Sequence, residues 1–307
     1  MSEILAPTGM DMPSPTLSAR LRELGDFFAA PGAERLTEEQ RALSLAIARR
    51  LVAATARRID RDFDSAALWT DWLYGGLPGG DRLAYFCFAR GEEHRWRARS
   101  AWTSEPAGRA PPAEAETQPD ATVAPREAEQ SEADEREGRA YLALQIAHRA
   151  RFDAAGQPTL TAHDLDSGTY RALLNDMAGW RLERLGGDPA LARQLGDHVR
   201  AALDEQTAGA GIDTAGRAYH QLLVTRGRLR AAAHDAAERH DWPTLIALLA
   251  AARDRLYAET SLALICADGD DLARLCAPLE LDTGALAQVE ASLARLPARA
   301  VGAGSRT

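Results

Sequence analysis

Lysine is absent from this chain of 307 residues, so all 36 of its Lys+Arg positions are arginines. Without lysine the protein cannot form a Schiff base with a carbonyl substrate or use an ammonium group as a general base. Arginine stays charged and binds carboxylate or phosphate groups through a planar fork. One class of covalent enzyme mechanism is therefore excluded, whereas ion pairing through guanidinium groups is not.

Cysteine and long apolar runs are also scarce. Cys87, Cys266 and Cys276 are irregularly spaced, which fits neither a disulfide framework nor a zinc site, so we expect reduced thiols and leave a Cys266–Cys276 pair open. The best apolar run, 245–252, is far shorter than the ~18 residues that a membrane span needs. The first residues lack the basic and apolar regions of a signal peptide. These features predict a cytoplasmic protein without a membrane span.

Recognisable catalytic and metal-binding motifs are lacking too. None of the seven histidines lies in a His-Glu-x-x-His segment or at zinc-ligand spacing from a cysteine. Glu92, Glu93 and His94 lack the second Glu-x-x-His segment that a carboxylate-bridged metal site requires. The glycine-rich segment 75–80 lacks the preceding strand and the following Lys-Ser/Thr of a phosphate loop. The sequence thus predicts no catalytic residue, no metal site and no cofactor.

Apolar residues recur at helical spacing through most of the chain, and no alternating strand pattern of useful length occurs. Thr37 and Gln40 have the spacing of a capping box in front of a helix of about six turns. Asp188, Asp241 and Asp282 are expected to cap later helices. We predict an all-α fold. The expected helices cover about 17–28, 37–63, 65–75, 80–104, 139–152, 165–185, 213–239, 241–266 and 282–297, and two further helices are expected to start at 189 and at 270.

Acidic charge is concentrated in one stretch. Segments 1–104 and 139–307 carry net charges of 0 and −2, whereas 105–138 has three arginines against ten acidic residues and is rich in proline. Such a composition cannot bury enough apolar surface to fold alone, although the last third of this stretch could join the following helix. We therefore predict a disordered tail (1–15), an N-terminal helical hairpin bundle (16–104), an acidic linker (105–138), a C-terminal antiparallel bundle or irregular α-solenoid (139–297) and a second tail (298–307).

Four segments carry a resemblance to a known family. They are LTEEQRALSLAIARRLV (36–52), RARFDAAGQPTLTAHDL (149–165), DPALARQLGDHVRAALDE (188–205) and the segment 241–281, which starts DWPTLIALLAAARDRLY. The chain resembles an alphaproteobacterial helical family catalogued as domain of unknown function twenty-three thirty-six. The resemblance implies an all-helical, non-enzymatic protein and supplies no catalytic residues.

Aromatic side chains gather between Trp69 and Trp102, where eight of the 18 in the chain occur. Aromatics commonly fill helical cores, but Trp, Tyr and Arg are also enriched at binding hot spots. We expect Trp69 and Phe86 to be structural and Trp96, which lies between two arginines, to be exposed. The predicted partner-binding residues are Trp72, Tyr85, Trp96, Arg95 and Arg97.

The leading functional hypothesis is a non-catalytic interaction or regulatory protein that binds a protein partner through a helical groove; a homo-oligomer is compatible with it. The alternative is an enzyme or small-ligand-binding protein with a site between helices, near His163, Tyr170 and Trp180. The acids beside His163 are more typical of helix caps than of an acid–base cluster. A third hypothesis, binding to nucleic acid or a membrane surface, is disfavoured by the lack of excess basic charge. It would use Arg49, Arg50, Arg57, Arg58 and Arg61.

Overall fold

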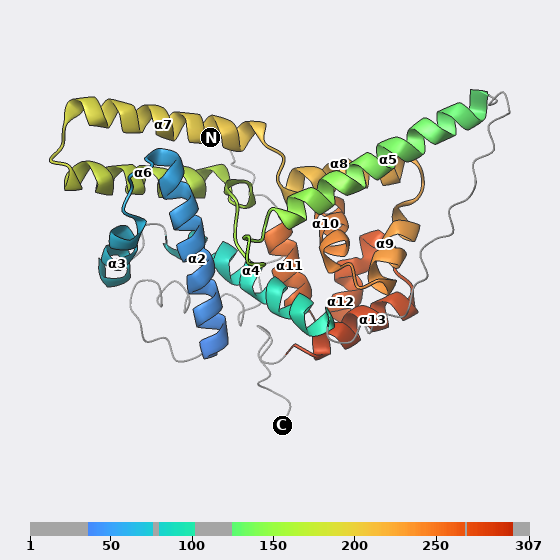
Figure 1. The fold of residues 1–307 in the computed structure, drawn as a ribbon. Coiled ribbons are helices and arrows are strands. Elements are labelled where there is room, and N and C mark those ends of the chain that lie inside the picture. The colour runs from blue at the N-terminus through green and yellow to red at the C-terminus, as the bar shows by residue number, and fades with distance from the viewer. Residues whose placement is uncertain (1–35, 76–79, 102–124, 268, 297–307) are drawn as a thin grey trace, which may run out of the picture.

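The computed structural model describes residues 36–75, 80–101, 125–267 and 269–296 (Figure 1). Within these ranges the chain has no β-strand, and one isolated bridge joins Phe152 to Pro158. The predicted all-α fold is therefore confirmed. The predicted tails at 1–15 and 298–307 and the predicted helix at 17–28 lie outside the described residues.

Short connections join most of the helices. In chain order the helices are α2 (Glu38–Ile59), α3 (Ser65–Gly75), α4 (Gly80–Ala101), α5 (Pro125–Arg149), the 3-10 turn η1 (Ala162–Asp164), α6 (Ser167–Arg184), α7 (Pro189–Ala208), α8 (Ile212–Thr225), α9 (Leu229–Glu238), α10 (Trp242–Ala252), α11 (Tyr257–Cys266), α12 (Gly269–Cys276), the 3-10 turn η2 (Ala277–Leu279) and α13 (Thr283–Ala294).

Helix starts follow the capping residues that the sequence offers. Thr37 and Gln40 form the predicted capping box, in which the Gln40 amide donates to Thr37 Oγ1 at 3.2 Å and the Thr37 amide donates to Gln40 Oε1 at 3.1 Å. Asp188, Asp241 and Asp282 cap α7, α10 and α13 as predicted, each accepting an amide hydrogen of the first turn. Local sequence therefore decides where these helices begin.

Two of the predicted helices, 213–239 and 241–266, are each broken into two, so these predictions are wrong. Gly227, with φ 64°, separates α8 from α9, and Asp254, with φ 49°, separates α10 from α11. In both turns the next amide, that of Arg228 or Arg255, bonds to a carbonyl five residues earlier, at 2.8 and 2.9 Å. The breaks let α9 and α11 fold back onto α10 instead of extending away from it.

The acidic stretch 105–138 is partly helical. Its last part, 125–138, forms the first half of α5. The sequence left open whether the last third of the predicted linker joins the following helix, and it does. Arg226 and Arg228, at the turn between α8 and α9, pair with Glu137 at 2.7 and 3.1 Å, and Arg226 also pairs with Asp134. These tertiary ion pairs offset the repulsion within the acidic helix. The remainder of the predicted linker, 105–124, lies outside the described residues.

Buried apolar side chains form two clusters. The first joins α2, α3 and the start of α4 to α6 and α7, and the second joins the end of α4 and α5 to helices α8 through α13. Helix α4 belongs to both, since Phe86 lies in the first and Trp96 in the second. The clusters do not follow the predicted domain boundaries, because α6 and α7 pack on the N-terminal helix α2.

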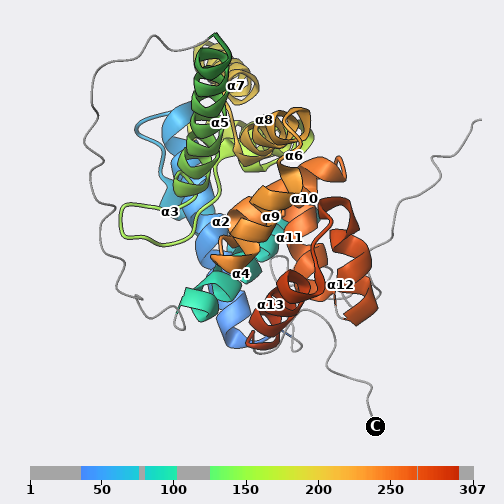
Figure 2. The ribbon, with the colours of Figure 1, turned by 90° about the vertical axis from the view of Figure 1, so that its right-hand side faces the viewer.

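The helix pair α6–α7 marks one end of the molecule. Figure 1 shows α6 and α7 side by side as a hairpin, while α5 reaches toward the opposite end; Figure 2 shows the C-terminal helices α9, α12 and α13 gathered below α5 and α8. No described helix is long and apolar enough to cross a bilayer.

Candidate functional site

The structure buries Trp96. Its side chain is 0% exposed, stacks on Trp242 with ring centroids 4.9 Å apart, and donates from Nε1 to Ser292 Oγ at 2.8 Å. The prediction that Trp96 is exposed is therefore wrong. Successive side chains of a helix point about 100° apart, so the flanking arginines do not report the face on which Trp96 lies.

The other predicted partner-binding residues do not form an exposed groove with Trp96. Trp72 is buried in the first cluster, and Tyr85 is half-buried against it, whereas Trp96 lies in the second. Trp69 and Phe86 are buried in the first cluster, which confirms the structural role expected for both. The four tryptophan and phenylalanine side chains named here thus belong to the two cores.

Arg95 and Arg97 are engaged within the molecule. Arg95 is buried and pairs with Glu92 at 2.7 Å and with Glu39 at 3.3 Å. The Arg97 guanidinium lies over the ring of Phe152, 4.9 Å from its centroid. Both guanidinium groups therefore contact side chains of the protein itself and do not extend a surface patch around Trp96.

A buried ionic cluster connects the two cores. Glu93 of α4 is fully buried and pairs with Arg90 at 3.1 Å and with Arg151 at 2.9 Å; it also accepts a hydrogen bond from Tyr257 of α11 at 2.9 Å. Arg151, after α5, also pairs with Asp164 of η1 at 2.8 Å. The members of the cluster come from four segments, with no more than two from any one of them. The sequence pattern of a single helix therefore did not reveal the cluster.

Electrostatics keep this cluster ionised. Burial would raise the pKa of Glu93, but the charges of Arg151 and Arg90 lower it to about 2. Burial lowers the pKa of the nearby His148 to about 3 and that of His94 to about 4, so both imidazoles are neutral in the folded protein. Glu93 is 0% exposed, so the cluster holds elements together inside the protein and does not present its central carboxylate at the surface.

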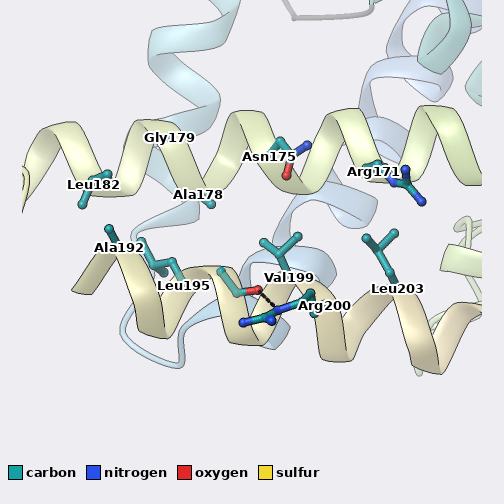
Figure 3. A pocket seen from close by; sticks show the side chains of 11 residues that line it. Arg171, Asn175, Ala178, Gly179, Leu182, Ala192, Leu195, Val199, Arg200 and Leu203 are labelled. Carbon is teal, nitrogen blue, oxygen red and sulfur yellow. Dashed lines mark hydrogen bonds between the residues drawn. The ribbon is translucent and has the colours of Figure 1, made fainter. Parts of the chain in front are cut away.

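An open groove runs between α6 and α7, with a volume of about 460 Å³ (Figure 3). Leu195, Val199 and Leu203 of α7 point toward α6 across it. Arg171 and Arg200 are exposed, and no acidic residue lines the groove. The groove is thus apolar at its floor and cationic at its edge.

A second, more polar cavity of about 330 Å³ lies where α2, α5, α6 and the segment before η1 meet. It brings together His163 and Tyr170, two of the three residues named for the alternative hypothesis, with Arg58 of α2. The third, Trp180, lies elsewhere: it stacks on Phe63 and donates to Asp71 at 2.9 Å.

Histidine, cysteine and carboxylate side chains are the usual protein ligands of metal ions. The described residues contain no group of three or more histidine, cysteine, aspartate or glutamate side chains placed to hold a metal ion. The three cysteines are not joined in disulfides, and burial raises the pKa of Cys276 to about 11.

Comparisons of the chain with family models, curated proteins and solved structures found no match. The resemblance to the alphaproteobacterial helical family stays a prediction. The two cavities are therefore interpreted from their own chemistry.

Proposed function

We propose that this protein is a helical interaction module that binds an acidic amphipathic helix of a partner protein in the α6–α7 groove. The observation that carries the proposal is the open groove itself, which two antiparallel helices line along about three turns. A third helix laid in such a groove completes a bundle and buries its apolar face.

The spacing of the groove residues fits a helical occupant. On α6 they fall at 171, 175, 178, 179 and 182, and on α7 at 192, 195, 196, 199, 200 and 203, so each helix presents one stripe of residues at steps of three and four. This is the spacing at which helices pack knobs into holes. The opposite side of the hairpin is already occupied, because Arg181 and Arg184 of α6 pair with Asp60 and Asp71, each at 2.7 Å.

Two glycines support a close approach by the partner. Gly179 and Gly196 lie inside helices, where glycine costs about 0.5–1 kcal/mol relative to alanine. A Cβ added at either position would meet no atom of the described chain within 4 Å, so packing inside the protein does not require glycine there. Small residues on both walls would let a third backbone come close.

Charge favours an acidic partner. Arg171 has no ion pair among the described contacts, and Arg200 pairs only with its helix neighbour Asp197, an exposed i,i+3 pair that contributes little. Carboxylates on the partner helix would meet both guanidinium groups at the groove edge. A second copy of this chain would instead bring the same arginines together.

The nucleic-acid hypothesis has less support. Of its five arginines, Arg50 donates to the Pro158 carbonyl at 3.0 Å and pairs with Asp153 at 3.3 Å, while Arg58 pairs with Glu205 at 2.8 Å. The net charge of the chain is −9, which opposes binding to a phosphate backbone.

Selection from a displayed library of helical peptides tests the proposal. The library carries apolar residues at heptad spacing with Asp and Glu on the flanks, over about four turns. We expect selected peptides to bind with roughly micromolar Kd. Gly196→Leu, which fills the groove, should weaken binding at least about tenfold, or about 1.4 kcal/mol, and Arg171→Glu should do likewise.

Two matched controls accompany these variants. Gly138→Leu changes a helix-interior glycine of α5 that also has open space around its Cβ, and Arg193→Glu changes an exposed arginine of α7 outside the groove. Both should bind like the wild type. The proposal is wrong if no peptide binds in this range, if Gly196→Leu binds normally, or if the groove proves to hold a second copy in a dimer that Gly196→Leu dissolves.

A further inference from the structure

The polar cavity at Tyr170 shares no lining residue with the α6–α7 groove. Leu51 and Leu160 supply apolar walls, and Thr55, Arg58 and Tyr170 supply polar groups. We infer that this cavity is a second binding site, which takes a small organic carboxylate: a carboxylate group on a short apolar body.

The Tyr170 hydroxyl provides the first reason. The side chain is 0% exposed and lines the cavity, and its hydroxyl hydrogen has no acceptor among the described residues. The Arg58 guanidinium lies near the hydroxyl but can only donate to its oxygen. Buried hydroxyl groups are nearly always bonded, because leaving one unpaired is unfavourable. Burial raises the pKa of Tyr170, against the opposing effect of the nearby Arg58, so the group stays a proton donor. An acceptor oxygen on a ligand would satisfy it.

Arg58 provides the cation. Its partner in the structure is Glu205 at 2.8 Å, but the two side chains are 41% and 61% exposed, and exposed pairs of this kind exchange partners at little cost. No acidic residue lines the cavity. One guanidinium and one phenol match a planar anion with two oxygens better than a doubly charged phosphate.

The shape of the cavity limits the ligand. A volume of about 330 Å³ lies at the lower end for small-molecule sites, which suits a compound of roughly ten non-hydrogen atoms. The turn after α7 forms one wall, since Ala210 and Gly211 line the cavity, and a Cβ on Gly209 or Gly211 would overlap the side chain of His163. Glycine at these two positions lets the turn lie directly against His163 and complete the wall.

Calorimetric titration of the full chain with sodium benzoate, sodium hexanoate, benzamide and inorganic phosphate tests the inference. We expect the two carboxylates to bind with Kd of about 1 mM or tighter. Benzamide, which has the same shape without the charge, and phosphate, which lacks the apolar body, should each bind at least about tenfold more weakly.

Variants separate a ligand role from a structural one. Tyr170→Phe should weaken benzoate binding about tenfold with little change in the melting temperature of the ligand-free protein, because the lost hydroxyl hydrogen had no acceptor and the neighbouring Arg58 is partly exposed. Arg58→Gln should abolish the preference for benzoate over benzamide, whereas Arg57→Gln, an exposed neighbour outside the cavity, should bind normally.

The inference is overturned if neither carboxylate binds the wild type, or if Tyr170→Phe binds benzoate as well as the wild type does. It would also fail if Arg58→Gln and Arg57→Gln behaved alike. The cavity and the groove share no lining residue, so failure of the carboxylate inference would not contradict the helix-binding proposal.

Discussion

Glu93 shows how single residues couple distant parts of this chain. It is 0% exposed, and its carboxylate meets two guanidinium groups and the Tyr257 hydroxyl, from α4, the segment after α5 and α11. Burying charges is costly, so such a cluster is tolerated only when every member has its partners. The arrangement adds little to the free energy of unfolding, but the loss of one member leaves a buried charge unpaired and is strongly destabilising.

Glu93→Gln is therefore expected to lower the free energy of unfolding by about 3–5 kcal/mol, because the amide cannot neutralise two buried arginines. Denaturant titration measures the change. The control is Glu132→Gln, which breaks an exposed i,i+4 pair with Arg136 (2.9 Å) and should cost no more than about 0.5 kcal/mol. Similar losses for the two variants would contradict a coupling role for Glu93.

The two buried histidines predict acid sensitivity. The pKa of His148 is lowered to about 3 by burial and by Arg97, Arg151 and Arg90, against the opposing charge of Glu93. The pKa of His94 is lowered to about 4 by burial and by Arg90, Arg97 and Arg50, again against Glu93. Below pH 6.5 the unfolded chain therefore binds protons that the folded chain excludes, so stability falls as pH drops from about 6.5 toward 4.

His148→Gln should flatten this slope, with a difference of about 1–2 kcal/mol in the pH dependence across the window. The measurement is the free energy of unfolding at pH 7, 6, 5 and 4.5 for wild type and variant. An unchanged slope would show that His148 is protonated in the fold or neutral in both states.

At the scale of elements, α5 illustrates how tertiary contacts can order an acidic segment. The side chains of Arg226 and Glu137 are 18% and 12% exposed, so their 2.7 Å pair is better shielded than a surface pair. Arg226 also donates to the Ala133 carbonyl at 3.0 Å. The first half of α5 is thus held by the turn between α8 and α9.

Arg226→Gln should therefore reduce hydrogen-exchange protection at 132–138 more than at 141–149, because only the first half of α5 is held by this side chain. Arg230→Gln, an exposed change on the next helix, is the control and should leave α5 unaltered. Equal protection in all three proteins would show that intrinsic helix propensity, rather than the ion pairs, orders this half of α5.

The helix starts and the helix breaks differ in how well the sequence predicts them. Thr37, Asp188 and Asp282 cap their helices through side chains that bond within three residues, so the sequence alone locates them. The break at Asp254 has no such local signal. There, Arg253 donates to the carbonyls of Arg274 and Leu275, at 2.8 and 2.9 Å, and these contacts come from a distant part of the chain.

At the scale of the whole molecule, the two cores are not separate N- and C-terminal units. Helix α4 packs on α2 at one end and reaches α13 through the bond from Trp96 to Ser292 at the other, and α6 and α7 return to α2. Composition predicts that proteases cut first within 105–138, and the helix from Pro125 onward narrows the expected cuts to 105–124.

The two fragments produced by such a cut should stay associated, because the cores between them are shared. Gel filtration of the nicked protein should give one peak containing both fragments, and denaturant should release them in one transition. Elution of two separately folded fragments would contradict the shared cores, and a first cut inside 165–260 would contradict the placement of the linker.

The sequence by itself determined the all-α class, most helix starts and the absence of known catalytic motifs, because capping and apolar periodicity act over a few residues. It could not determine which face of α4 each aromatic residue takes, so it placed Trp96 at the surface although Trp242 and Ser292 enclose it. Only the tertiary structure decided the ionic cluster at Glu93, the groove between α6 and α7, and the meeting of Arg58 with Tyr170. The cluster and the cavity join residues far apart in the chain, and the groove lies between two consecutive helices. The geometry of all three depends on how helices pack, which no local pattern encodes.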